Sequence, residues 1–262
     1  MPVPNTETLL AAYDEQVRPA ETRNLPAGAY AEPDGPVVRV IGMHHRGFVT
    51  GQPDLGVDGA ELDELIARQR DFFAAREESV EWKTRGHDLP ADLPKRLVAA
   101  GFVAEPLETV LIGVAADLAT PVRVDGVTVR EVVDDEDMRR IAAMSSEVWD
   151  TDRGWMAAEL IERDRARVVV VIAEADGQVV SSARLVFEPG TEFAGLWGGA
   201  TLAAWRGRGI YRALVAHRAT VATERGARYL QVDATDDSRP ILQRLGFTAV
   251  TTTTPYVFNL AR

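Results

Sequence analysis

A glycine-rich, basic stretch between a β-prone run and a long amphipathic segment constrains this chain more than any other feature. The stretch reads AAWRGRGIYRALV over residues 203–215, follows the β-prone residues 192–202, and opens an amphipathic segment that continues to about Arg225. Gly207 and Gly209 free the backbone to turn its N–H groups toward one point, and a helix beginning near Gly209 adds unpaired amides and a dipole. The sequence therefore predicts a strand, an anion-binding loop and a helix in succession.

Positive charge gathers at this loop although the chain is acidic overall. Arg206, Arg208 and Arg212 lie close together, whereas the whole chain has a formal net charge of −11. Because guanidinium groups bind phosphate oxygens with forked hydrogen bonds, this contrast favours a phosphate ligand over a generic charged surface. The simpler alternative is an Arg/Gly loop that leads into a solvated helix.

The loop resembles the cofactor-binding motif of the GNAT acyltransferase family, R/Q-x-x-G-x-G/A, which cradles the pyrophosphate of acetyl-CoA. Arg206, Gly209 and Tyr211 fall on its three defined positions. The third position departs from the motif, because the family has Gly or Ala where this chain has Tyr211. Since the backbone N–H is available whatever the side chain, we expect binding to survive, with the phenol turned aside or contributing a hydrogen bond. The resemblance implies these coenzyme-binding residues: Ala200, Thr201, Arg206, Gly207, Arg208, Gly209, Ile210 and Tyr211.

Length and composition predict a two-lobed globular protein without cysteine chemistry. The chain has 262 residues, of which 46% are hydrophobic and 26% charged, which is enough for two domains with a substantial core. It has no cysteine, which removes disulfides, thiolate catalysis and cysteine-based metal sites together. His44 and His45 are adjacent, but no third ligand stands at a helpful spacing, so we interpret them as turn residues and expect no metal.

The charge balance and the N-terminal sequence bear on partners and location. A pI near 4.9 disfavours nucleic acid and anionic membranes as partners. It suits a cationic small-molecule or peptide amine, although acidity is also a common route to solubility. Residues 1–5 lack a basic region followed by an apolar run, and no stretch of 18 apolar residues occurs, so we expect a cytoplasmic protein. A homodimer is a candidate assembly.

Hydrophobic periodicity and turn residues predict the elements of each half. In the first half we expect helices over 6–18, 60–77 and 94–100, strands over 37–41, 46–50, 80–83 and 101–114, and a surface loop over 19–36. After a linker over 115–125 we expect a strand over 127–130, helices over 134–148 and 155–164, a hairpin over 167–174 and 178–187, and a strand over 192–202. The helix to 225, a strand over 229–232, a helix over 238–245 and a strand ending near 258 follow.

Two Gly-Phe pairs indicate a weak internal repeat. Gly101-Phe102 and Gly246-Phe247 lie 145 positions apart, and each follows a long helix, a strand, a loop and a short helix in the same order. Duplication of one α/β unit explains this order, and chance recurrence is the alternative, because glycine commonly caps helices. The acidic entrance of the helix over 60–77 would repel a diphosphate, so the first copy is expected to have lost the phosphate loop.

The second half resembles the GNAT fold over roughly residues 127–260, and the first half resembles it in topology only. The resemblance implies an α/β (α+β) fold with a mixed, mostly antiparallel central sheet flanked by helices, in two lobes. The expected domains are a degenerate GNAT-like lobe over residues 1–118 and a GNAT N-acetyltransferase domain over residues 119–262.

In the GNAT family the strand before the phosphate loop and the strand after its helix splay apart, and the pantetheine arm lies in the gap. The first of these strands contains Gly198 and Gly199 in this chain, and paired glycines inside a strand typically mark a bulge or a close backbone approach. The resemblance therefore implies that the thioester lies beside this strand, with backbone N–H groups near Ala200 and Thr201 facing the oxyanion. A bulge needed for packing alone is the alternative.

Transfer to an amine also requires a base and an acid. Glu192 and Asp233 are the candidates for the base, and each is alternatively a solvated strand-end residue. Many family members have Tyr in the short helix four residues before the Gly-Phe pair, where this chain has Leu242.

Three hydroxyl groups are candidates to replace that missing tyrosine as the acid, and water is another. They belong to Ser238, which is also a natural helix N-cap, to Tyr211 and to Tyr256. Acceptor specificity is expected from the acidic segment over residues 146–152, which suits a cationic amine, with a solvated helix end as the alternative.

The leading hypothesis from the sequence is an acyl-CoA-dependent N-acyltransferase that uses acetyl-CoA and acylates a primary amine directly in a ternary complex. The absence of cysteine excludes a cysteine-bound acyl-enzyme. A non-catalytic acyl-CoA-binding or sensing protein is the alternative, favoured by Leu242 and by a first lobe without a phosphate loop. Transfer of a larger acyl group is a further alternative.

Overall fold

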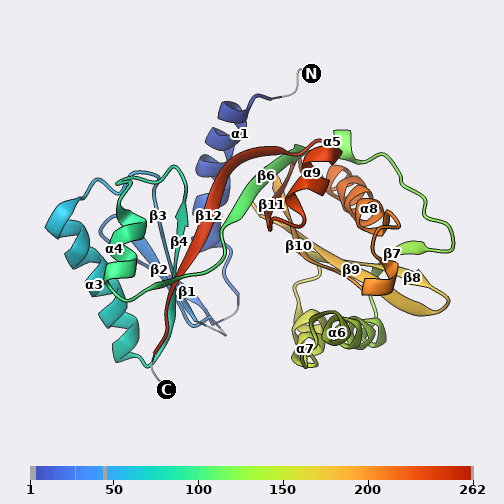
Figure 1. The fold of residues 1–262 in the computed structure, drawn as a ribbon, viewed down its shortest axis with the longest axis horizontal. Coiled ribbons are helices and arrows are strands. Elements are labelled where there is room, and N and C mark those ends of the chain that lie inside the picture. The colour runs from blue at the N-terminus through green and yellow to red at the C-terminus, as the bar shows by residue number, and fades with distance from the viewer. Residues whose placement is uncertain (1–3, 27, 44–45, 261–262) are drawn as a thin grey trace. The chain divides into compact units, whose positions relative to one another are not determined.

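The computed structural model describes residues 4–26, 28–43 and 46–260. Its helices are α1 (Thr6–Ala12), α2 (Arg18–Arg23), α3 (Gly59–Ala75), α4 (Leu93–Ala99), α5 (Ala115–Leu118), α6 (Asp135–Trp149), α7 (Trp155–Glu162), α8 (Ile210–Glu224) and α9 (Arg239–Leu245), with a π-helical turn at Tyr13–Val17 and a 3-10 turn at Ala203–Trp205. Its strands are β1 (Tyr30–Asp34), β2 (Val37–Ile41), β3 (Gly47–Gly51), β4 (Val80–Arg85), β5 (Val103–Ala104), β6 (Glu108–Val114), β7 (Thr128–Val132), β8 (Val168–Ala175), β9 (Gln178–Phe187), β10 (Phe193–Thr201), β11 (Tyr229–Ala234) and β12 (Thr248–Phe258) (Figure 1). None of the helices in these ranges is long and apolar enough to cross a membrane.

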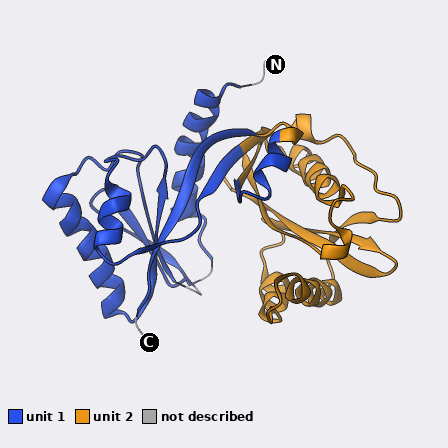
Figure 2. Cartoon of the chain, in the orientation of Figure 1, with its two compact units in different colours: residues 1–111, 233–243, 248–262 blue, residues 112–232, 244–247 orange. Residues whose placement is uncertain are grey.

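The chain divides into two compact units, and neither unit is continuous in sequence (Figure 2). Unit 1 comprises residues 1–111, 233–243 and 248–262, and unit 2 comprises residues 112–232 and 244–247. The division differs from the domains predicted from the sequence at residue 118, because the final strand belongs to unit 1. There β12 pairs antiparallel with β4 over six residues, from Thr253 opposite Arg85 to Phe258 opposite Val80.

Unit 1 contains a sheet in the order β1-β2-β3-β4-β12, with β5 paired to β12. Its hydrophobic core lies where α3 and α4 cover the sheet. The core includes the buried side chains of Phe73 in α3, Leu97 in α4 and Trp82 in β4. Strands β3 and β4 are parallel neighbours over only three positions, from Gly47 opposite Val80 to Val49 opposite Trp82. Beyond Val49 and Trp82, no further residues of β3 and β4 pair with each other among the described residues.

The helical start of the chain is longer than the sequence predicted. The expected surface loop over residues 19–36 is wrong at both ends, because helix continues to Arg23 and β1 begins at Tyr30. Pro19 lies in α2 directly after the π-helical turn at Tyr13–Val17, where the N–H of Arg18 donates to the carbonyl oxygen of Tyr13, and its fixed φ is compatible with helix. Burial of Val17 and Ala20 then stabilises the continuation. The adjacent histidines His44 and His45 lie outside the described residues.

Unit 2 contains a sheet in the order β11-β10-β9-β8-β7, antiparallel except for the β10–β11 pair. Helix α8 lies on one face of this sheet, and α6 and α7 lie on the other (Figure 1). The sequence predicted every one of these elements within a few residues, since each has a strong apolar period and clear turn residues at its ends. This mixed, mostly antiparallel sheet with helices on both faces confirms the predicted fold class.

Candidate functional site

The glycine-rich loop has the backbone conformation that the sequence predicted. Gly207 and Gly209 have φ angles of 75° and 84°, in the left-handed region that favours glycine. A Cβ atom on Gly207 would have no neighbour within 4 Å, so this glycine serves the backbone conformation and not packing. Helix α8 begins at Ile210 without a side-chain cap from Gly209. The amides of its first turn therefore have no partner within the helix, and they are available to an anion.

The arginines of the loop are exposed, and two of them are oriented by neighbours. The Nε of Arg206 donates to the carbonyl oxygen of Thr201 at 3.1 Å, and the guanidinium of Arg208 lies 4.6 Å from the centre of the Trp205 ring. Among the described residues, no carboxylate forms an ion pair with Arg206, Arg208 or Arg212. Their charge is thus not neutralised locally, which favours an anionic ligand at this place.

The side chain of Tyr211 is turned toward β10. A Cβ atom built on Gly199 would lie 3.3 Å from Cε2 of Tyr211, so the ring packs on the glycine of that strand. Burial raises the pKa of Tyr211, and Arg218 opposes the shift only in part. The phenol therefore carries its proton at neutral pH.

Strand β10 separates from β11 where the sequence predicted a gap. The two strands pair in parallel over three positions only, from Phe193 opposite Tyr229 to Gly195 opposite Gln231. The register of β10 with β9 then shifts between Trp197 and Ala200, which marks a β-bulge. Pairing with β11 thus stops just before the bulge, and the backbone edge of β10 is free of β11 from there to the loop.

Ala200 and Thr201 are held at the loop end of β10 by one serine of β9. The hydroxyl of Ser181 donates to the carbonyl oxygen of Ala200 at 2.7 Å, and it lies 2.8 Å from the hydroxyl of Thr201. Ser181 is fully buried, so these contacts fix the position of β10 directly before the phosphate-loop residues.

The two carboxylates proposed as bases lie in different surroundings. Glu192 precedes the paired end of β10, and its carboxylate is 3.4 Å from the guanidinium of Arg228. At about 3.3 Å per residue, Glu192 lies about 20 Å along the strand from Gly198. The structure therefore does not bring Glu192 to the bulge.

Asp233 is the last residue but one of β11 and belongs to unit 1, where its carboxylate accepts from Nζ of Lys83 at 3.0 Å. The side chain of Asp233 is only 4% exposed. Burial alone would lower the pKa of Lys83, but the charges of Asp233 and Glu21 raise it. Asp233 is therefore a buried counter-ion of Lys83, and its carboxylate is engaged in that ion pair.

The hydroxyl candidates for the acid also lie in different surroundings. Ser238 precedes α9, and its Oγ donates to the carbonyl oxygen of Thr235 at 3.2 Å and lies 3.3 Å from the hydroxyl of Thr235. Leu242 is fully buried in α9, so no hydroxyl stands at that position. Tyr256 lies in the hydrophobic core of unit 1 opposite Trp82. Of the three tyrosine and serine candidates, Tyr211 is the one beside the bulge of β10.

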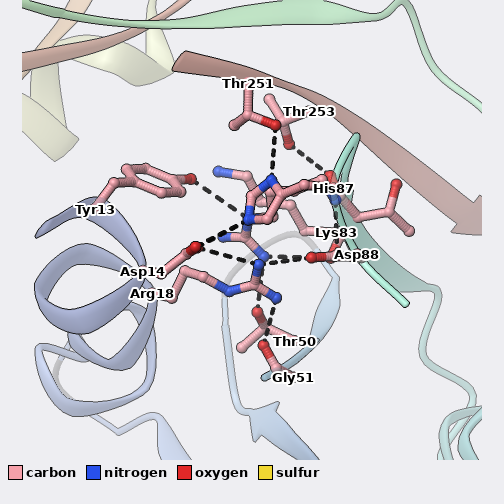
Figure 3. A network of polar contacts seen from close by, with 12 residues as sticks. Tyr13, Asp14, Arg18, Thr50, Gly51, Lys83, His87, Asp88, Thr251 and Thr253 are labelled. Carbon is pink, nitrogen blue, oxygen red and sulfur yellow. Dashed lines mark hydrogen bonds and ion pairs between the residues drawn. The ribbon is translucent and has the colours of Figure 1, made fainter. Parts of the chain in front are cut away.

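In unit 1, the space beyond the paired part of β3 and β4 is occupied by the protein's own side chains (Figure 3). Arg18 donates from Nη2 to the carbonyl oxygen of Gly51 at 2.7 Å, and Arg85 donates from Nη1 to the hydroxyl of Thr50 at 3.0 Å. Glu21 lies 2.6 Å from Nη2 of Arg85 and 3.2 Å from Nζ of Lys83. The space beyond the paired part of β3 and β4 is thus filled by charged side chains that bond to one another and to the backbone.

The network predicts a specific loss of stability in acid. Burial would raise the pKa of Glu21, but the charges of Arg85 and Lys83 lower it to about 2. Because this folded-state pKa is below the ordinary value of about 4.3, the stabilisation is complete above about pH 5 and is lost as the pH falls toward 2. We expect the difference in unfolding free energy between wild type and Glu21→Gln, measured by urea titration, to shrink over this range. A constant difference from pH 6 to pH 2.5 would contradict the assignment.

One cavity of about 540 Å³ lies in unit 2, away from the β10–β11 gap. Its lining comes from the linker at residues 121–127, from β7 and from one face of α8, and includes His217 and Thr220. It approaches the loop at Ala213, whose N–H donates to the carbonyl oxygen of Gly209 at 3.0 Å, and at Val124, whose Cγ2 would lie 4.0 Å from a Cβ on Gly209. Within the described ranges, no group of three or more His, Cys, Asp or Glu side chains has the arrangement of a metal site.

Sequence reasoning missed the interior cations. Lys83, Arg85, Arg184 and Arg218 are buried or half-buried, and none of them entered the predicted site. Arg184 interrupts the otherwise apolar and small run of β9, and a single charge in such a strand is the signal that would have drawn attention to it. Lys83, Arg85 and Arg218 lie in segments where other charged residues are common, so no single charge stands out.

The second half of the chain matches a known protein family. The model of the acetyltransferase (GNAT) family matches residues 134–247, a range that contains the loop, α8 and the β10–β11 gap. No curated protein matches the sequence significantly. The chain is similar in fold to a GCN5-related N-acetyltransferase from Kribbella flavida, with 22% identity, a TM-score of 0.74, and coverage of 94% of this chain and 95% of the other.

Two further solved structures cover nearly the whole chain. A GCN5-related N-acetyltransferase from Sphaerobacter thermophilus is 15% identical with a TM-score of 0.65, covering 97% of this chain and 94% of the other. A tandem GNAT protein from the clavulanic acid biosynthesis pathway is 14% identical with a TM-score of 0.63, covering 93% of this chain and 87% of the other. At these identities the likeness shows the fold, and it extends over both units. Residues 134–247 thus form a domain of the acetyltransferase (GNAT) family, within a chain whose two-lobed fold is GNAT-like throughout.

Proposed function

We propose that this protein is an N-acyltransferase of the cytoplasm that transfers the acetyl group of acetyl-CoA to a primary amine on a small molecule or peptide. The observation that carries the proposal is the loop at Arg206–Tyr211, where two left-handed glycines and the uncapped start of α8 present amides beside exposed arginines. These groups fit the two phosphates of a coenzyme A diphosphate. The free edge of β10 leads from that loop to the bulge, and it suits an extended, amide-bearing arm.

The reaction follows from this arrangement as a direct transfer. The neutral amine attacks the thioester carbonyl carbon, the C–N bond forms, and the C–S bond breaks with departure of a thiolate that takes up a proton. Backbone N–H groups near Ala200 and Thr201 would stabilise the oxyanion, and the Ser181 hydroxyl holds both residues in place. Tyr211, which lies beside the bulge, and water are the candidates for proton transfer that this geometry favours, whereas Glu192 lies away from the bulge and Asp233 and Ser238 bond to Lys83 and Thr235.

Heating the protein with and without acetyl-CoA tests the proposal. A ligand at 100 times its Kd stabilises the folded state by about 2.7 kcal/mol, which is a readily measured rise in Tm. Absence of a shift at millimolar acetyl-CoA would remove the assignment of the loop. Thiol release across a panel of amines then tests catalysis.

Tyr211→Phe separates two roles of this side chain, which are packing of the ring against Gly199 and donation of a proton to the departing thiolate. Because the ring packs on Gly199 while the hydroxyl carries a proton at neutral pH, the variant should keep its Kd for acetyl-CoA within about threefold and lose turnover. A loss of about 10²-fold in kcat is the expected contribution of a positioned acid. Calorimetry gives the Kd and thiol release gives kcat, with Tyr229→Phe on β11 as the matched control. Unchanged kcat in Tyr211→Phe would leave the proton to water.

A non-catalytic acyl-CoA sensor is the second candidate, and Leu242 favours it. This residue is fully buried at the position where many relatives have a tyrosine, so α9 supplies no acid to the leaving thiolate. The two candidates differ in one measurement, because a sensor binds acetyl-CoA without releasing thiol to any amine. Tight binding with no turnover across a broad amine panel would favour the sensor.

A further inference from the structure

The bulge of β10 carries a guanidinium group that the reaction outlined above does not use. Arg184 of β9 stands opposite Trp197, directly before the register shift. Gly198 has a φ of 60°, and a Cβ atom there would lie 2.9 Å from Nε and 3.2 Å from Nη2 of Arg184. The guanidinium therefore packs flat against the bulge, in the space that any other residue at position 198 would occupy.

The charge of Arg184 is only weakly compensated. Its carboxylate neighbour, Glu159 of α7, comes no closer than 3.5 Å and is itself half exposed. By contrast, Arg140 on the same domain meets both Asp137 and Glu174 at 2.6 Å. The Nε of Arg184 is buried and has no hydrogen-bond partner among the described residues. Arg184 thus has donor capacity to spare at the bulge.

A second cation supports this positive region from the helix side. Arg218 of α8 is 1% exposed, and it donates from Nη1 to the carbonyl oxygen of Arg184 at 3.0 Å and from Nε to that of Leu214 at 3.1 Å. Burial lowers its pKa to about 10, so it is still charged at neutral pH. Within the described part of the chain, no carboxylate forms an ion pair with Arg218. The positive charges of Arg184 and Arg218 therefore both favour binding of an anion at this segment of β9 and β10.

An exposed aromatic ring lies next to this region. Trp197 is 42% exposed, and its indole Nε1 would lie 2.4 Å from a Cβ on Gly195, so the ring lies across the backbone of β10. A large aromatic side chain that is exposed on a central strand, beside a cation with unused donors, is typical of a binding surface. It offers a flat apolar face to the body of a ligand.

We infer that the acceptor is an amine that also bears a carboxylate, held by the guanidinium of Arg184 with its apolar part against Trp197. The inference rests on the proposed acetyl transfer at the β10 bulge. The planar fork of Arg184 matches a carboxylate in geometry, and a long, exposed contact to Glu159 is readily exchanged for it. The anchored carboxylate leaves the amine free to approach the thioester.

The acidic segment over residues 146–152, which was predicted to suit a cationic amine, does not oppose a carboxylate at Arg184. Asp152 accepts a hydrogen bond from the backbone N–H of Gly154 at 2.8 Å and so stabilises the start of α7. Asp150 ends α6 in the left-handed conformation, with a φ of 48°. Both residues have a local structural role, whereas Arg184 has spare donors at the bulge itself.

Binding of two matched product analogues tests the inference without requiring turnover. N-acetyl-L-phenylalanine and N-acetylphenethylamine differ only in the carboxylate, and their Kd values are measured by calorimetry with and without saturating coenzyme A. A charge-assisted fork should favour the carboxylate compound by about 10- to 100-fold. Equal affinity of the two compounds, or a preference for the uncharged one, would overturn the inference.

Two variants assign the preference to this residue. Arg184→Gln should remove the discrimination, Arg184→Lys should retain only part of it, and Arg139→Gln on the exposed surface of α6 should leave it intact. The Tm shift with acetyl-CoA should persist in all three variants, which shows that each folds and separates this test from that of the proposed function. If Arg184→Gln instead lowers kcat equally for amines with and without a carboxylate, Arg184 acts on the thioester and the acceptor assignment is wrong.

Discussion

Arg206→Glu combined with Gly209→Asp is expected to weaken acetyl-CoA binding by at least about 100-fold. Each change places a carboxylate where the ligand's diphosphate would lie, and loss of one charge-assisted contact alone corresponds to about 1.5–3 kcal/mol. Gly209 has a φ of 84°, so aspartate there also strains the backbone that turns the loop amides toward one point. Calorimetric titration with acetyl-CoA measures the change.

The opposite end of α8 offers a matched control. Arg225→Glu with Gly226→Asp makes the same two substitutions, at an arginine that ends the helix and at a glycine with a φ of 83°. This variant carries the same charge change and a similar backbone strain, yet it should bind acetyl-CoA like the wild type. Equal loss in both variants would mean that net charge, and not the loop, determines binding.

Glu21→Gln is expected to lower the unfolding free energy of unit 1 by about 3–5 kcal/mol, the usual cost of removing one member of a buried ion pair. Arg85 has a fully buried side chain and Lys83 one that is 14% exposed, and both depend on the carboxylate of Glu21. The amide leaves two buried cations with Asp233 as their main remaining counter-ion. The protein has little excess stability to absorb such a change.

Tryptophan emission during urea unfolding measures the effect, and the difference from a Trp82→Phe background isolates the signal of unit 1, because the other four tryptophans belong to unit 2. Trp82 lies in the core of unit 1 and is 1% exposed, so its emission shifts when that core opens. The control is Glu15→Gln, an exposed residue of the same helical segment, which should change the free energy by less than about 0.5 kcal/mol. If Glu21→Gln is as mild as the control, the network contributes to specificity of the fold and not to its stability.

Most of the secondary structure was predictable because local patterns determine it. The apolar period of α6 and α8, the turn at residues 175–177 and the glycines of the loop all act within a few residues. The errors have separate causes. Helix α5 lies inside the linker expected over residues 115–125, and the strand expected over residues 101–114 is divided into β5 and β6. The loop expected over residues 19–36 was wrong because Pro19 was interpreted as a break although it lies within α2. A proline after a helical segment can mark either the end of the helix or its continuation, and only the burial of Val17 and Ala20 decides between these outcomes.

The catalytic candidates were less predictable than the loop. Glu192 and Asp233 were selected because each ends a strand, but strand ends do not specify neighbours. The structure places Glu192 far from the bulge and pairs Asp233 with Lys83, a residue 150 positions away in the chain. Proton-transfer groups depend on such long-range contacts, whereas a phosphate loop is made by consecutive backbone amides.

The sequence by itself determined the order of elements, the two-lobed α/β architecture and the backbone conformation of the glycine-rich loop, because periodicity and turn residues are local properties. Tertiary structure alone decided that β12 belongs to unit 1, that charged side chains fill the space beyond β3 and β4, and that Arg184 lies against the bulge at Gly198. These features arise from pairing and burial between segments far apart in the chain, where the free energy depends on which groups lose water together and not on the order of residues.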